Sequence, residues 1–241
     1  MDNKCNYLGC EMLTPACYHV NFLWPCNEML NPCVMSIMKL RATFPLMLLL
    51  ITASLSCRKN KKETPEQTSS VAITGQDYQT IAIGDQIWTV TNYAGAGGIF
   101  YDDAKTKPEY GKYYTFEEAK AIVLPEGWRI PSREDFIKLA ESQGVVFNGF
   151  EALNPEPLKK LASKSRWKNI SGTNESGFNA YPAGYSLNNS APQDGDICEF
   201  WTTDGTTVSI QEGANSQYRF TFYNDSANPV YKFNLRFVRN R

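Results

Sequence analysis

Histidine is nearly absent from this chain, and the single one, His19, lies close to the N-terminus. The rest of the sequence therefore cannot form a histidine-based catalytic triad or a histidine-ligated metal site. Cysteine is also scarce, because only Cys198 occurs after Cys57. Since Cys198 stands next to Glu199 in an aromatic stretch, we interpret it as a small buried residue and not as a reactive thiol.

An excess of charge of either sign is also lacking, with 24 basic and 25 acidic residues and a formal net charge of -1. No basic stripe is available to neutralise phosphates, so we expect no nucleic-acid partner. Adjacent carboxylates occur at Asp102–Asp103 and at Glu117–Glu118 and could in principle serve acid–base hydrolysis. Acids in turns and in the first turn of a helix more often cap and solvate. We therefore predict a protein that is not an enzyme.

Long hydrophobic runs are missing too, since the longest has about a dozen residues and a membrane-spanning helix needs about 20. That run lies in residues 38–57, after Lys39 and Arg41 and before small residues that end at Cys57. The segment resembles a bacterial lipoprotein signal peptide, which implies cleavage before Cys57 and lipidation of that cysteine. An ordinary secretory signal is the alternative.

Residues 1–37 precede this signal and are expected to be an over-extended N-terminus, with translation starting at Met35 or Met38. They contain five cysteines, none of them in a Cys-x-x-Cys pair, so we predict no zinc site. Residues 58–75 begin with a basic run and have no large apolar residue before Val71, which predicts a flexible tether. We expect the lipid bilayer as one partner and the outer membrane of the cell envelope as the location, facing either the periplasm or the outside.

The folded domain is predicted to span residues 76–241, and its most informative stretch is Pro125–Phe136. Ser132 is expected to cap a helix through the amide of Asp135, with Phe136 and the residues at helical spacing after it buried. A hairpin is predicted around residues 84–86 and a second, shorter helix after Thr115. Strands are predicted at residues 177–185, 198–203, 217–223 and 231–238. Two helices followed by several antiparallel strands indicate the α+β class.

Six motifs resemble, in the same order, those of the Fibrobacter succinogenes major paralogous domain family: residues 78–88, 111–119, 125–136, 176–184, 200–203 and 235–239. The helix start of that family also resembles the one in formylglycine-generating sulfatase-modifying domains, which implies a C-type lectin-like fold. The oxidase activity of those domains needs a cysteine pair that this domain lacks. Relatives carry cysteines at the positions of Leu124 and Phe237, so we infer that these two apolar side chains touch.

Three tryptophans, Trp88, Trp128 and Trp201, lie within the family motifs and are expected in the core. Candidate ligand-binding residues therefore come from the loops between Trp167 and Asp204. They combine aromatic faces with amides and carboxylates, which suit a sugar. These residues are Trp167, Tyr185, Asn188, Asn189, Asp194 and Asp196.

The acidic loop around Asp194 and Asp196, with Glu199 and Asp204 close in sequence, has two interpretations. Clustered oxygen ligands suit calcium, while a solvated turn, which we favour, needs no ion. We accordingly predict no cofactor. The resulting hypothesis is a non-catalytic envelope lipoprotein that binds a glycan or surface polymer. The alternative is a structural or protein-interaction lipoprotein of an envelope or adhesion assembly.

Overall fold

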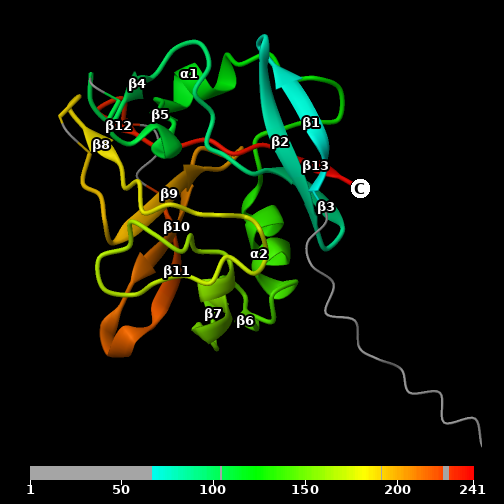
Figure 1. Cartoon of the computed structure of the whole chain (residues 1–241), viewed down its shortest axis with the longest axis vertical. Helices are drawn as coiled ribbons and strands as arrows, with labels where there is room; N and C mark the ends of the chain where they lie inside the picture. The colour runs from blue at the N-terminus through cyan, green and yellow to red at the C-terminus, as the bar shows by residue number, and fades with distance from the viewer. Residues whose placement is uncertain (1–66, 104, 191, 225–227) are drawn as a thin grey trace, which may run out of the picture. The chain divides into compact units, whose positions relative to one another are not determined.

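The computed structural model describes residues 67–103, 105–190, 192–224 and 228–241 (Figure 1). Cys57, residues 1–37 and the signal segment 38–57 lie outside the described residues. The described chain begins with a four-stranded antiparallel sheet in the order β1-β2-β3-β13. Its strands are β1 (Gln67–Ile73), β2 (Gln76–Ile83), β3 (Gln86–Thr89) and β13 (Val238–Asn240).

Strand β1 occupies part of the segment that the sequence assigned to a flexible tether over residues 58–75. Val71 pairs with Tyr78 of β2, and Ile73 is fully buried. Thr74 and Gly75 both have positive φ angles, 48° and 82°, as a two-residue turn of the I′ type requires. The tether prediction was therefore wrong for residues 67–75, because the polar start of the segment concealed a short hairpin strand.

The two α-helices are α1 (Phe116–Lys120) and α2 (Arg133–Glu141). Both begin with a capping box: the Ser132 hydroxyl accepts from the Asp135 amide, and the Asp135 carboxylate accepts from the Ser132 amide. The predicted start of α2 is thus confirmed. Its buried residues include Phe136, Leu139 and Ala140, as the helical spacing indicated.

A second antiparallel sheet has the order β11-β10-β9. Its strands are β9 (Ile197–Trp201), β10 (Thr207–Glu212) and β11 (Tyr218–Tyr223). Shorter pairs and 3-10 helices complete the described chain: β4 (Ile99–Phe100) with β5 (Lys112–Tyr113), β6 (Phe147–Asn148) with β7 (Glu151–Ala152), β8 (Ser186–Leu187) with β12 (Tyr231–Lys232), η1 (Pro108–Tyr110), η2 (Glu156–Lys160) and η3 (Ala214–Ser216). The domain is therefore α+β, with mostly antiparallel strands and two α-helices.

Two of the predicted strands differ from the observed ones. Residues 177–185 form only isolated bridges, at Ala180, Gly184 and Tyr185, because the chain turns at positive-φ positions and at Pro182. Residues 231–238 belong to strands only at their two ends, in β12 and at the start of β13, with isolated bridges at Phe233 and Asn234 between them. Strand β10 was missed, although its partners β9 and β11 were predicted to within a few residues.

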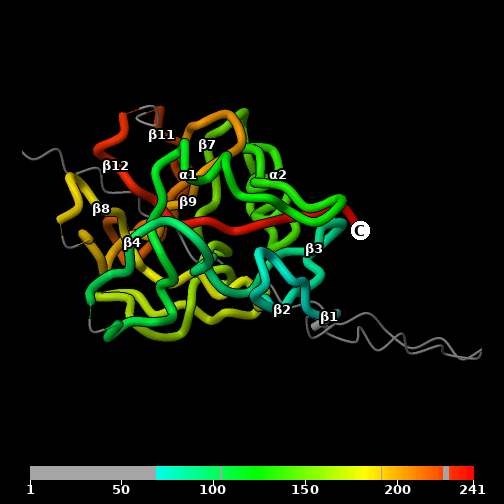
Figure 2. The backbone as a smooth tube through the Cα atoms, turned by 90° about the horizontal axis from the view of Figure 1, so that it is seen from above, coloured from blue at the N-terminus to red at the C-terminus, as the bar shows by residue number. Residues whose placement is uncertain are grey.

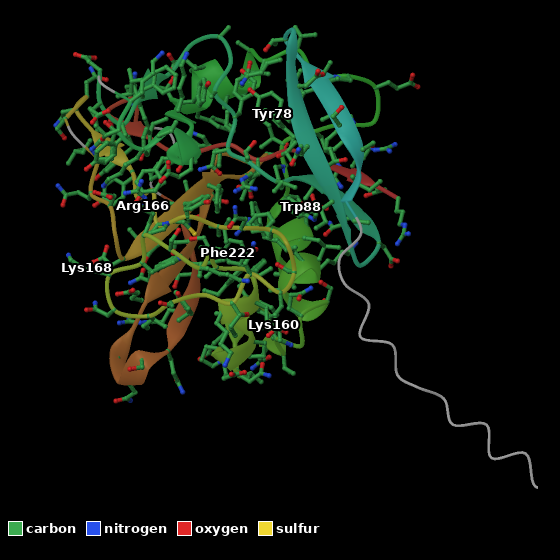
Figure 3. All side chains as sticks on the ribbon, in the orientation of Figure 1. Tyr78, Trp88, Lys160, Arg166, Lys168 and Phe222 are labelled. Carbon is green, nitrogen blue, oxygen red and sulfur yellow. The ribbon has the colours of Figure 1, made fainter. Side chains whose placement is uncertain are left out.

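In the core, helix α2 packs against both sheets. The ring of Phe136 on α2 lies 5.1 Å from that of Trp88 on β3 and 5.9 Å from that of Phe200 on β9. Figure 3 places Trp88 between the first sheet and α2. Viewed from above, strands β1–β3 remain on one side of the domain, with β4 and β8 on the other, in agreement with the first view (Figure 2).

Burial supports most of the predicted core. Trp88, Trp201 and Cys198 are fully buried, whereas Trp128 is only partly buried. Phe237 is fully buried, and Leu124 packs against the apolar cluster that contains it. The proposed contact between these two side chains thus falls within one cluster.

Candidate functional site

Trp167 does not present an open stacking face. Its ring meets Tyr218 edge-on at 4.9 Å between centroids, and its indole Nε1 donates to the carbonyl of Ala180 at 3.2 Å. The side chain packs at the margin of the core and is only partly exposed. Trp167 therefore has a structural role that its polar neighbours in the sequence did not indicate.

Tyr185, Asn188 and Asn189 also have structural explanations. The ring of Tyr185 packs at 5.8 Å from that of Phe233. Both asparagines are exposed and have φ angles of 53° and 56°, while the amide of Ser190 donates to the carbonyl of Leu187 at 2.9 Å. Asparagine tolerates this left-handed conformation better than most residues, so the pair makes the tight turn after β8.

Asp194 is the predicted site residue that makes the most side-chain contacts. Its Oδ1 accepts from the hydroxyl of Tyr101 at 3.1 Å, and its Oδ2 accepts from the hydroxyl of Tyr110 at 3.1 Å. The ammonium of Lys107 also donates to Oδ2 and forms an ion pair with it. We call these four residues the Asp194 cluster. Asp196, by contrast, is exposed, and its backbone carbonyl accepts from the amide of Glu212.

The contacts of Asp194 bear on the calcium interpretation of the acidic loop. The carboxylate is surrounded by an ammonium and two phenol donors, which complement its charge without a metal ion. Within the described part of the chain, no group of three or more His, Cys, Asp or Glu side chains could hold a metal ion. Asp194 therefore acts here as an acceptor for protein donors.

Local structure brings Lys107 and Tyr110 to the carboxylate. The helix η1 begins at Pro108, and the Tyr110 amide donates to the Lys107 carbonyl at 3.0 Å, so both side chains leave one tight turn. On the Asp194 side of the cluster, the absence of a side chain at Gly184 lets the backbone of residues 193–194 lie directly against it. A Cβ at Gly184 would lie 1.5 Å from the carbonyl oxygen of Gln193, so only glycine fits there.

The surroundings of Lys107 and Tyr110 raise the pKa values of both side chains. Burial alone would lower the pKa of Lys107, but hydrogen bonds and the charge of Asp194 raise it above its ordinary value. Burial, with the charge of Asp194, raises the pKa of the Tyr110 phenol well above its usual range. Lys107 therefore stays charged and Tyr110 stays a hydrogen-bond donor.

Neighbouring loops join the Asp194 cluster. The Nε of Arg166 donates to Oε1 of Glu109 at 2.6 Å, and the amide of Lys168 donates to the carbonyl of Gly195 at 2.8 Å. Figure 3 shows Arg166 and Lys168 near one another on the same side of the domain. Residues 101–103, 105–110, 166–168 and 194–196 are thus connected by these contacts, and we call them the loop surface.

The loop surface combines charged and aromatic groups. It offers a fixed carboxylate, cations and the ring of Tyr101, over which the Lys107 ammonium lies at 4.1 Å from the centroid. Sequence reasoning missed Tyr101, Lys107 and Tyr110, because residues 100–114 have no regular helical or strand periodicity. The signal available was composition, since aromatic and lysine side chains alternate through that stretch.

The described residues define a class, an α+β domain of mostly antiparallel strands with polar and aromatic side chains on its loops. The chain belongs to the family described as the Fibrobacter succinogenes major domain, whose model matches residues 58–239. The family resemblance of the six sequence motifs is thereby confirmed. Comparisons with curated proteins and with solved structures found no match.

Proposed function

We propose that this protein is a non-catalytic lipoprotein of the cell envelope whose loop surface binds a glycan. The observation that carries this proposal is the Asp194 cluster, in which one carboxylate is held by Lys107 and two tyrosine hydroxyls. Sugars are bound through fixed polar groups beside aromatic faces, and the cluster supplies both. The side chains of Lys107 and Asp194 are 21% and 16% exposed to solvent, so a ligand can reach them.

A glycan array probed with the full chain tests this proposal. The variant Tyr101→Ala removes one ring and one donor to Asp194, and we expect binding to fall at least tenfold. Tyr223→Ala is the matched control, because the Tyr223 hydroxyl also donates to a side-chain acceptor, Gln211 at 3.0 Å, but lies outside the loop surface. Failure of every glycan to bind, or equal losses in the two variants, would reject the proposal.

The anchor and the finer fold are parts of the same proposal. A lipid on Cys57 is supported by the signal-like segment 38–57, and a C-type lectin-like fold is supported by the resemblance of the α2 start. In the described residues, no helix is long and apolar enough to cross a membrane. Labelling of cells with a palmitate analogue should mark the wild-type protein and not Cys57→Ser. Protease shaving of intact cells should then decide between the periplasmic and outward-facing placements.

A second candidate function, interaction with an envelope protein, is favoured by the hairpin of β6 and β7. Three of its side chains are large, apolar and about half exposed: Val146 55%, Phe150 49% and Leu153 57%. Apolar side chains gathered at one surface site are typical of protein contacts. Crosslinking in cells would support this function if Leu153→Ser removed a specific partner while glycan binding stayed unchanged.

A further inference from the structure

Two lysine side chains converge on one aromatic ring beside the loop surface. The ammonium of Lys105 lies 4.6 Å from the centroid of Phe100, and that of Lys112 lies 4.9 Å from it. These distances keep the two charges within about 10 Å of each other, no more than the Debye length at 0.1 M ionic strength. The protein therefore holds two like charges where solvent ions screen them incompletely.

Neither of these ammonium groups forms an ion pair with a carboxylate of the described residues. Lys112 instead donates to the carbonyls of Gly95 at 2.8 Å and Gly97 at 3.0 Å. An ammonium has three donors, so one remains for a ligand. Two nearby cations differ in this respect, because Lys107 pairs with Asp194 and Arg166 pairs with Glu109.

The backbone places both lysines at Phe100. Lys112 on β5 is the direct cross-strand partner of Phe100 on β4. Lys105 has a left-handed φ of 54°, and its amide donates to the carbonyl of Asp102 at 3.1 Å. The carboxylate of Asp102 accepts from the amide and hydroxyl of Thr106, at 2.9 and 2.6 Å. Asp102 therefore fixes the turn that carries Lys105 without forming an ion pair with it.

We propose that Lys105 and Lys112 form an anion-binding site for the carboxylate or sulfate group of an acidic glycan. This inference rests on the proposed glycan function, because Phe100 directly precedes Tyr101 of the Asp194 cluster. Hydrogen bonds from ammonium to an anionic oxygen are about twice as strong as neutral ones, which favours charged sugars over neutral ones.

The experiment compares matched glycans on the full chain by titration calorimetry. The probes are oligogalacturonate against its methyl ester, and dextran sulfate against dextran. We expect at least one acidic probe to bind tenfold or more tightly than its neutral counterpart, with an affinity that falls as salt rises. The double variant Lys105→Gln/Lys112→Gln should abolish this preference.

Lys120→Gln is the matched control for the lysine variants. Its ammonium lies 4.9 Å from the Phe116 centroid, like that of Lys112, but it pairs with Glu117 at 2.7 Å. Removing it should leave the preference for acidic glycans intact. An unchanged thermal midpoint in the double variant would show that any loss of binding is not a loss of folding.

The remaining outcomes separate this inference from the proposed function. If acidic and neutral probes bind equally, the anion site is overturned while glycan binding stands. If the array and both pairs of probes give no binding, both proposals fall. Vesicles of phosphatidylglycerol form the last arm, because a lipid headgroup offers the same negative charge. Binding to vesicles through Lys105 and Lys112, without binding to acidic glycans, would overturn the inference.

Discussion

Replacement of Asp135 by alanine should cause one of the largest losses of stability available in this domain. The Asp135 carboxylate is 4% exposed and accepts four hydrogen bonds. Two come from the guanidinium of Arg129, one from the amide of Ser132 at 2.7 Å, and one from the side-chain amide of Gln86 at 2.8 Å. One carboxylate therefore joins β3, the Pro125–Phe136 stretch and the start of α2.

The expected loss follows from the environment of each donor. The variant loses the hydrogen bond from the Ser132 amide to the Asp135 carboxylate, which is one of the two bonds of the capping box, and this loss costs about 1 kcal/mol. The Gln86 side chain is buried, so its amide would be left without an acceptor, at about 1–3 kcal/mol. The Arg129 side chain is 41% exposed and can be solvated again, so its ion pair contributes only about 0.5–1 kcal/mol. Together these effects predict a loss of about 2.5–5 kcal/mol.

Urea unfolding of the full chain, followed by tryptophan fluorescence, measures this loss. The control is Glu134→Ala, which removes the neighbouring acid of the same helical turn from an exposed position and should change the free energy of unfolding by less than about 0.5 kcal/mol. A loss below about 1 kcal/mol for Asp135→Ala, or equal losses for both variants, would refute the reasoning.

Three further predictions concern buried groups. Burial opposes ionisation of Asp135, but Arg129 and Ser132 hold its pKa below the ordinary value, so its stabilisation should be complete above pH 4 or so and disappear as the pH falls below that value. Urea unfolding between pH 2 and 6 should show a smaller loss of stability on acidification in Asp135→Ala than in the wild type, and the dependence that remains comes from groups such as Glu118 and Asp204, whose pKa values are also lowered. Arg236→Lys should cost about 3 kcal/mol in urea unfolding, because lysine cannot replace a buried guanidinium that binds several carbonyl oxygens. Burial raises the pKa of Cys198 to about 12, so mass-mapped maleimide labelling should modify this thiol only after unfolding.

Local signals predicted the helices well. The capping boxes at Thr115 and Ser132 depend on residues three positions apart, so the sequence contains all the information that they need. The 177–185 segment was mispredicted for the opposite reason, because its bridges join distant segments, such as the pairing of Gly184 with Cys198, which no local pattern reveals. Strand β1 was missed although its partner β2 follows it directly in the chain, because its first residues are polar.

The candidate site illustrates the same limit. Asp194 was selected from the sequence, but its partners Tyr101, Lys107 and Tyr110 lie 93, 87 and 84 positions earlier in the chain. Trp167 was selected for its polar neighbours, although its ring packs against Tyr218. Composition can identify a residue type that suits sugar binding, whereas the direction of the side chain depends on tertiary packing.

The Pro125–Phe136 stretch links separate parts of the fold and has few groups left over for a ligand. The backbone of Arg129 exchanges two hydrogen bonds with Val238, each 3.0 Å long. The amide of Thr203 donates to the carbonyl of Pro131 at 2.8 Å, and the guanidinium of Arg133 pairs with Asp204 at 2.9 Å. The stretch thus ties β13 and the β9–β10 turn to α2. Because the loop surface shares none of these residues, we expect substitutions of its side chains to leave the links that hold the domain together intact.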